Sequence, residues 1–69
     1  EKRYDGYFLM DNGFKVSFDI SEEEGGEEFS ELCDNSNFSF ERGSCIWLGD
    51  DRYILVDKVI GFSINEYLE

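Results

Sequence analysis

Apolar and polar side chains alternate through much of this chain, and the clearest alternation is FKVSFDI, residues 14–20. Successive side chains of a β-strand point to opposite faces, so this pattern predicts a half-buried strand. Asn12-Gly13 precedes it and suits a two-residue type I′ turn, which predicts a hairpin between 4–10 and 14–20. The side chains of the second strand expected to face the core are Phe14, Val16, Phe18 and Ile20.

The same period of two continues after the acidic middle of the chain. NFSFER and SCIWL read as two strands joined at Gly43, which predicts a second hairpin. GDDR then predicts a turn, and Gly61 is expected to mark a bend or bulge between the last two strands. The strands predicted in this half of the chain span 37–42, 44–48, 53–57 and 62–67.

Only EEFSELCDN interrupts the strand pattern. Phe29, Leu32 and Cys33 recur there at helical spacing, which allows at most one short helix near 27–33. Short strands with frequent turn signals favour a mainly β fold, a small antiparallel barrel or strongly bent sheet of five to six strands and of SH3-like or Sm-like size. Residues 1–69 are expected to form one small acidic β domain.

Composition allows such a fold despite a net charge of −11, because 41% of the residues are hydrophobic and 17% are aromatic. Disordered acidic segments lack that apolar content. A chain of 69 residues buries only about 60% of the surface that its unfolded form exposes, so stability is expected to be small. No apolar run approaches the roughly 18 residues that a membrane-spanning helix needs, so no membrane role is expected.

The negative charge is concentrated in one interval. Residues 16–41 hold nine acids and no base, whereas 1–15 hold three of each and 42–69 hold five acids and three bases. Charge runs are usually solvated faces that keep a protein soluble, and one interpretation of residues 16–41 is such a face. The other is a binding surface for a basic partner, with candidate residues Asp19, Glu22, Glu23, Glu24, Glu27, Glu28, Glu31 and Asp34.

The residue types present argue against catalysis and against a dedicated metal site. The chain has no histidine, so Ser-His and Cys-His nucleophile pairs are excluded, and Cys33 and Cys45 cannot build a zinc site in one chain. An EF-hand register that starts at Asp19 fails, because Glu24 takes the glycine position and Ser30 the final glutamate position. We therefore expect no enzyme activity, no cofactor and no metal residues, and two buried reduced thiols that favour the cytoplasm.

Anionic ligands are also disfavoured. Five glutamates surround Gly25-Gly26, and they would repel the phosphate that a glycine-rich turn otherwise binds. Direct nucleic-acid binding relies on Lys and Arg, of which there are six against seventeen acids. The expected partner is a basic protein, such as an enzyme that itself binds nucleic acid.

In size and charge the chain resembles the small acidic inhibitors with which phages and mobile elements occupy nucleic-acid-binding clefts. The resemblance implies a non-catalytic inhibitor or nucleic-acid mimic. One alternative is an SH3-like regulatory or structural module that binds through aromatic anchors, and a second is a weak divalent-cation-binding domain. The apolar outer faces of the strands also suggest a homodimer. The candidate aromatic anchors are Tyr7, Trp47 and Tyr53.

Overall fold

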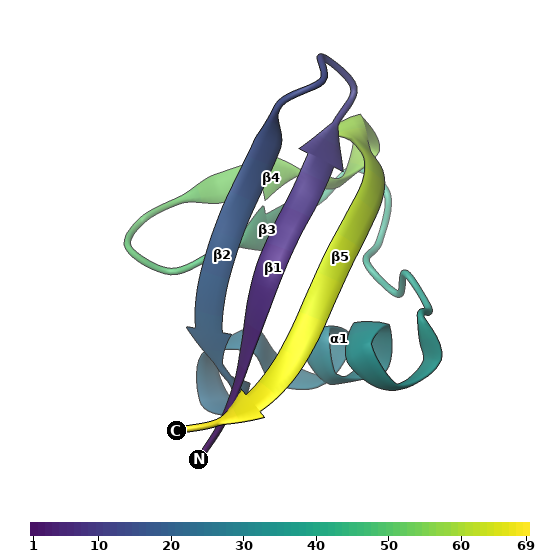
Figure 1. The fold of residues 1–69 in the computed structure, drawn as a ribbon. Helices are drawn as coiled ribbons and strands as arrows, with labels where there is room; N and C mark the ends of the chain where they lie inside the picture. The colour runs from purple at the N-terminus through teal and green to yellow at the C-terminus, as the bar shows by residue number, and fades with distance from the viewer.

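Two layers make up the fold: a three-stranded antiparallel sheet in the order β2-β1-β5, and behind it α1 together with the antiparallel pair β3-β4 (Figure 1). The computed structural model describes residues 1–69. In chain order the elements are β1 (Lys2–Met10), β2 (Lys15–Ser21), α1 (Glu22–Asn35), β3 (Cys45–Trp47), β4 (Tyr53–Leu55), the 3-10 turn η1 (Val56–Lys58) and β5 (Val59–Leu68). None of the helices combines the length and apolar composition that a bilayer crossing requires.

The predicted first hairpin is present, and Phe18 and Ile20 face the core as expected. β1 and β2 pair antiparallel, with Tyr4 opposite Ile20. Phe18 and Ile20 are buried, while Lys15 and Asp19 on the other face of β2 are exposed. A slip of one residue would exchange these two faces and bury the charges, which fixes the pairing.

The loop of this hairpin has three residues and not two, so the predicted type I′ turn is wrong. Gly13 N donates to Met10 O at 2.9 Å, and Met10 N donates to Phe14 O at 2.8 Å. Only Gly13, with φ +89°, has positive φ; Asn12 does not, and its side chain instead accepts from Phe14 N. Phe14 lies beside this loop, at the end of the sheet just before β2. Phe14 is 70% exposed and Val16 half-buried, so the expectation that Phe14 faces the core is also wrong.

α1 spans 14 residues and takes up the acidic stretch that was predicted to be mostly loop. Ser21 starts it as the N-cap residue: the Ser21 hydroxyl accepts from Glu24 N and donates to Glu24 Oε1 at 3.2 Å. Gly26, at φ 68° and ψ −163°, interrupts the helix after its first turn. The helix ends where Ser36, in the left-handed conformation, donates its N–H to Leu32 O.

The predicted strand 37–42 is not formed, and the hairpin expected from it is wrong. Phe38 and Phe40 are half-buried, and their rings fill the space between α1 and the three-stranded sheet. Side-chain packing therefore holds this segment without a hydrogen-bond ladder. β3 pairs instead with the following strand β4, with Ile46 opposite Ile54 and both side chains buried.

The predicted turn between β3 and β4 is confirmed. Arg52 N donates to Gly49 O at 3.0 Å, and Asp50 and Asp51 both have positive φ, at 53° and 60°. This is the type I′ geometry that matches the twist of a hairpin. Arg52 also donates from Nη1 to Ser17 O at 3.1 Å, so the hairpin covers part of the free edge of β2.

A bulge interrupts β5 at the position predicted for an irregularity. Leu9 pairs with Gly61, but the next residue, Met10, pairs with Val59. Ile60 is therefore the extra residue on β5, and it is 64% exposed. The strand continues on both sides of Gly61, so it is longer than the sequence pattern predicted.

The fold is a small mixed α/β domain with five strands in two antiparallel sheets, and the predicted mainly β barrel is not found. No ladder joins the two sheets, because β3 and β4 have three residues each and α1 fills the rest of the second layer. One core lies between the layers. Its largest fully buried side chains are Tyr4, Phe8, Ile20, Phe29, Leu32, Ile46 and Leu48.

Candidate functional site

Seven of the eight predicted acidic site residues lie on α1, where the structure brings them together. Phe29 and Leu32 bury one face of the helix against the sheet. The acids occupy the remaining surface: Glu31 is half-buried and the other six are exposed. The acidic surface of α1, as we call it below, consists of Glu22, Glu23, Glu24, Glu27, Glu28, Glu31 and Asp34.

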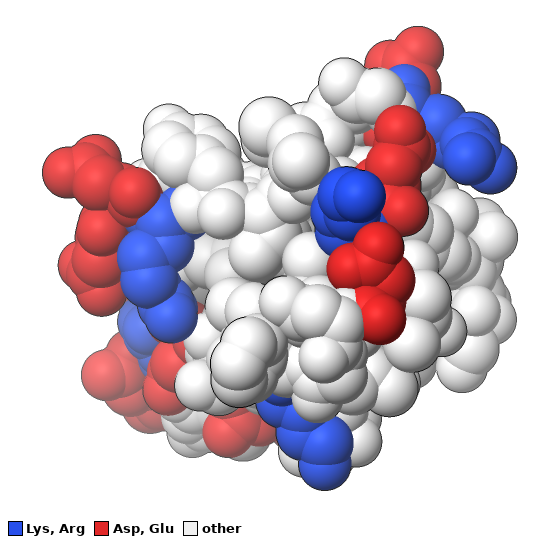
Figure 2. Space-filling model, turned by 90° about the horizontal axis from the view of Figure 1, so that it is seen from above, with Lys and Arg blue, Asp and Glu red and all other residues white.

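No base of the protein neutralises this surface. The chain forms five ion pairs, and all of them use acids outside α1: Lys2–Glu66, Arg3–Asp19, Arg3–Glu69, Arg42–Asp57 and Lys58–Asp11. Figure 2 looks onto the end of the molecule away from α1 and shows blue side chains beside red ones around an uncharged centre. The unpaired negative charge is thus concentrated on the helix.

Asp19, the eighth predicted acid, is held elsewhere. It lies on the outer face of β2, where its Oδ1 accepts from Arg3 Nε at 2.9 Å. The Tyr67 hydroxyl donates to its Oδ2 at 2.7 Å. The hydrogen bond from Tyr67, followed by that from Arg3, holds the pKa of Asp19 below its ordinary value, and the same contact raises the pKa of Tyr67. Asp19 ties β2, β1 and β5 together and is not part of the acidic surface.

This contact predicts a pH-dependent loss of stability in an Asp19→Asn variant. A depressed folded pKa contributes stability above the unfolded value of about 3.9, and that contribution is lost as pH falls through the folded pKa. The variant should therefore be less stable than the parent at pH 7 in urea unfolding, and the gap should shrink below about pH 4. Asp50→Asn, at an exposed acid without a partner, is the control. A gap that stays constant with pH would contradict the assignment.

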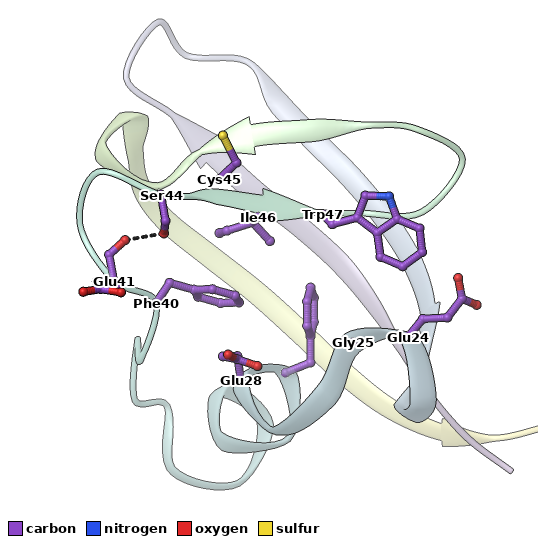
Figure 3. Close-up of a pocket in the computed structure, with 10 residues that line it drawn as sticks. Glu24, Gly25, Glu28, Phe40, Glu41, Ser44, Cys45, Ile46 and Trp47 are labelled. Atoms are coloured by element: carbon purple, nitrogen blue, oxygen red, sulfur yellow. Dashed lines mark hydrogen bonds between the residues drawn. The ribbon is translucent and has the colours of Figure 1, made fainter.

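A groove opens between α1 and β3, with a volume of about 290 Å³ (Figure 3). Phe40 and Ile46 point into it, and Trp47 stands beside Glu24 at one end. Glu24 reaches the turn between β3 and β4, since its Oε2 is 3.9 Å from where a Cβ on Gly49 would lie. We call this the helix–hairpin groove; its acids are Glu24, Glu28 and Glu41, and its aromatic and aliphatic residues include Phe29, Phe40, Ile46 and Trp47.

Sequence reasoning found only part of this groove. Glu24, Glu28 and Trp47 were among the predicted site residues, but Phe40 and Glu41 were not. Glu41 is the last residue of the interval without bases, so its charge was visible in the sequence. Its place beside α1 was not, because it depends on how the irregular segment before β3 folds back.

The three predicted aromatic anchors do not share a face. Trp47 and Tyr53 pair across β3 and β4 on the outer side of that hairpin, with 37% and 62% of their surface exposed. Leu55 continues this face and is 51% exposed. Tyr7 lies on the outer face of the three-stranded sheet, half-buried, with Lys15 Nζ 4.6 Å from its ring centroid. Tyr7 and Tyr53 therefore lie on different sheets and do not form one continuous binding surface.

Both cysteines are free, and the expectation that both are buried is wrong for Cys45, which is exposed. Cys33, Asp34 and Glu66 place one potential ligand atom each within 4.8 Å of one another. Burial, then Glu66 and Asp34, raise the pKa of the Cys33 thiol, so the protonated form is favoured. Glu66 also pairs with Lys2 at 3.5 Å, which would compete with a cation.

Comparisons of the chain with protein-family models, with curated proteins and with solved structures found no match.

Proposed function

We propose that this chain is a non-catalytic acidic domain that binds a basic surface of a partner protein, and that it acts as an inhibitor or nucleic-acid mimic at a nucleic-acid-binding site. The observation that carries the proposal is that none of the seven acids of the acidic surface has an ion-pair partner within the chain. With both thiols free, we place the protein in the cytoplasm.

Helix stability accounts for only part of this charge. Glu22, Glu23 and Glu24 lie in the first turn of α1, where carboxylates gain from the partial positive charge of the helix N-terminus. The other four acids lie beyond that turn, and Asp34 is near the C-terminus, where a negative charge is unfavourable. No base occurs in the last turn to offset it. The remaining acids therefore cost stability through mutual repulsion, which a basic partner would relieve.

The helix also changes how the charges are spaced. The acids were expected on an extended strand and loop, but on α1 they lie on two helical segments that meet at the kink of Gly26. Closely spaced carboxylates on a rigid element can meet Arg and Lys side chains that otherwise bind phosphates. Such surfaces associate quickly, and their association weakens as salt increases.

A second reading, the aromatic interaction module, is favoured by the exposed pair of Trp47 and Tyr53 with neighbouring Leu55. Large exposed aromatics are frequent anchors of protein interfaces. In this case the binding energy would lie on the outer face of β3–β4, and salt would change affinity little. A homodimer through exposed apolar residues is a further expectation, which sedimentation at high concentration would test.

The decisive experiment compares two charge variants against a basic partner captured from lysate at low salt. The first changes Glu22, Glu23, Glu24, Glu27 and Glu28 to Gln, and the second changes Glu1, Asp5, Asp50, Asp51 and Glu69 to Gln or Asn. Each removes five negative charges from −11 and leaves −6. Association rates are measured across a salt series.

We expect the α1 variant to fold and to associate at least about tenfold more slowly at low salt, with a flatter salt slope, because steering depends on the charge facing the partner. The association rate of the matched variant should fall much less. Equal losses would show that net charge alone steers binding, and no loss in either variant would show that the acids only solubilise the chain. For the mimic form of the proposal, the parent should also displace DNA from a DNA-binding partner.

A further inference from the structure

We propose that the helix–hairpin groove receives an arginine side chain of the partner, with an apolar neighbour of that arginine resting on the outer face of β3–β4. The inference rests on the proposed function and names the chemistry that its site recognises. It is carried by charge complementarity: three acids line a groove that also holds Phe40 and Trp47, and no base of the chain forms an ion pair with those acids.

The acids of the groove are a spatial cluster and not a run in the sequence. Glu24 and Glu28 come from α1, on either side of the kink at Gly26, and Glu41 comes from the segment before β3. None of the three forms an ion pair in the chain. In Figure 3 Glu41 and Glu24 stand at opposite ends, with Glu28 between them on the helix side. A cation inside the groove would therefore face carboxylates on more than one side.

The rest of the lining suits the methylene groups and the planar guanidinium of an arginine side chain. Half-buried Phe40 offers apolar surface, against which the methylene groups of a long basic side chain pack while its charged end stays near water. Trp47 presents an aromatic face, and Trp is the strongest cation–π partner among the side chains. A volume of about 290 Å³ lies at the lower limit for drug-sized ligands, so one side chain is the expected occupant.

Arginine fits these contacts better than lysine or a metal ion. The guanidinium is planar, stacks on aromatic rings and donates five N–H groups in a fork that matches carboxylates. The ammonium of lysine is compact and strongly hydrated, so it gains less from an aromatic wall. Divalent cations need a shell of oxygens, which the aromatic half of the groove does not supply.

The groove continues onto an exposed apolar surface that an adjacent partner residue would cover. Trp47 belongs both to the groove and to the outer face of the hairpin, where Tyr53 lies opposite it and Leu55 lies opposite Cys45. Tyr53 and Leu55 are more than half exposed. An arginine beside a leucine or similar residue would fill the groove and cover this face together.

A short peptide tests the inference without the natural partner. The probe is acetyl-Ala-Leu-Arg-Leu-Ala-amide, with lysine and citrulline versions as controls; citrulline keeps the shape of arginine and removes its charge. Trp47 is the only tryptophan, so its fluorescence reports on this groove alone. We expect quenching by the arginine peptide, binding weaker by severalfold for lysine and by at least about tenfold for citrulline, because charge-assisted hydrogen bonds are the strong ones.

Two charge-matched variants separate the groove from the helix as a whole. The groove variant carries Glu24→Gln, Glu28→Gln and Glu41→Gln, and the helix keeps its N-cap bond, because Ser21 Oγ accepts from the backbone N–H of residue 24. The control carries Glu22→Gln, Glu23→Gln and Glu27→Gln. Backbone amide shifts of Gly25 and Ile46 confirm folding and follow titration with the arginine peptide. Affinity should fall at least about tenfold in the groove variant and less than threefold in the control.

The outcomes divide cleanly. Equal binding of the citrulline peptide, equal losses in the two variants, or no binding of any peptide would overturn the arginine groove. If the arginine groove were overturned but the five-Gln α1 variant still lost its captured partner, the proposed function would stand and only the groove would be rejected. If neither triple variant nor the five-Gln variant weakened that partner, both proposals would fail.

Discussion

Replacing Gly6 with Ala should remove most or all of the stability of this domain. Gly6 lies in the central strand β1 with φ +147°, a conformation that L side chains rarely adopt. A Cβ there would lie 1.9 Å from Ser63 O and 2.8 Å from Ser63 C, both backbone atoms of β5. β5 would have to move away from β1, and its ladder with β1 holds it in the sheet.

We expect the Gly6→Ala variant to lose about 3–5 kcal/mol of unfolding free energy, the range of severe single-site defects. Domains have about 0.05–0.15 kcal/mol per residue, which gives about 3–10 kcal/mol for 69 residues, so a loss of that size removes a large part or all of the stability. Urea unfolding followed by Trp47 fluorescence measures it. Gly13→Ala is the control, because Gly13 also has positive φ but its Cβ would meet nothing within 4 Å. Equal losses in both variants would show that backbone conformation, and not the contact with β5, decides the effect.

Replacing Phe29 with Ala should separate α1 from the sheet. Phe29 is 2% exposed, and its ring centroid lies 5.2 Å from that of Phe18, 5.7 Å from Phe40 and 6.1 Å from Phe8. It is therefore the residue at which the helix, the sheet and the irregular segment meet. Besides Leu32, it is the only residue that α1 buries. Phe to Ala substitutions in cores cost about 3–5 kcal/mol.

We expect Phe29→Ala to lower the unfolding free energy by that amount and to reduce helical circular dichroism, because few apolar contacts would remain to offset repulsion among the helix acids. Phe14→Ala, at a side chain that is 70% exposed, should change stability by less than about 0.5 kcal/mol. If the Phe29 variant keeps its helical signal and loses no more than the control, the helix does not depend on this contact.

If these stability predictions hold, they also bear on the site. Glu24 and Glu28 stand on α1, and the aromatic residues of the helix–hairpin groove stand on α1, β3 and the segment between them. The groove exists only while Phe29 holds the helix on the sheet. Binding experiments are therefore best done with charge-for-amide variants, which leave these packing contacts unchanged.

Local signals predicted the first hairpin, the turn between β3 and β4 and the irregularity near Gly61, and they failed where the outcome depended on distant neighbours. The acidic stretch that forms most of α1 was predicted to be a solvated loop, although Ser21 and Glu24 have the spacing of a capping box. Gly25 and Gly26 also obscured the helix, since glycine weakens helices in general. The burial of Phe29 and Leu32 compensates for that.

By itself the sequence determined the features that follow from a short repeat of apolar and polar residues or from counting charged residues. The alternation in β2 set which faces of the strand are buried, and the absence of bases between residues 16 and 41 set where negative charge gathers. Only the tertiary structure decided which acids act together. It placed Asp19 with Arg3 and Tyr67, 16 and 48 residues away, and it brought Glu41 and Trp47 beside α1. Those pairings depend on packing between distant segments, and no local pattern encodes that packing.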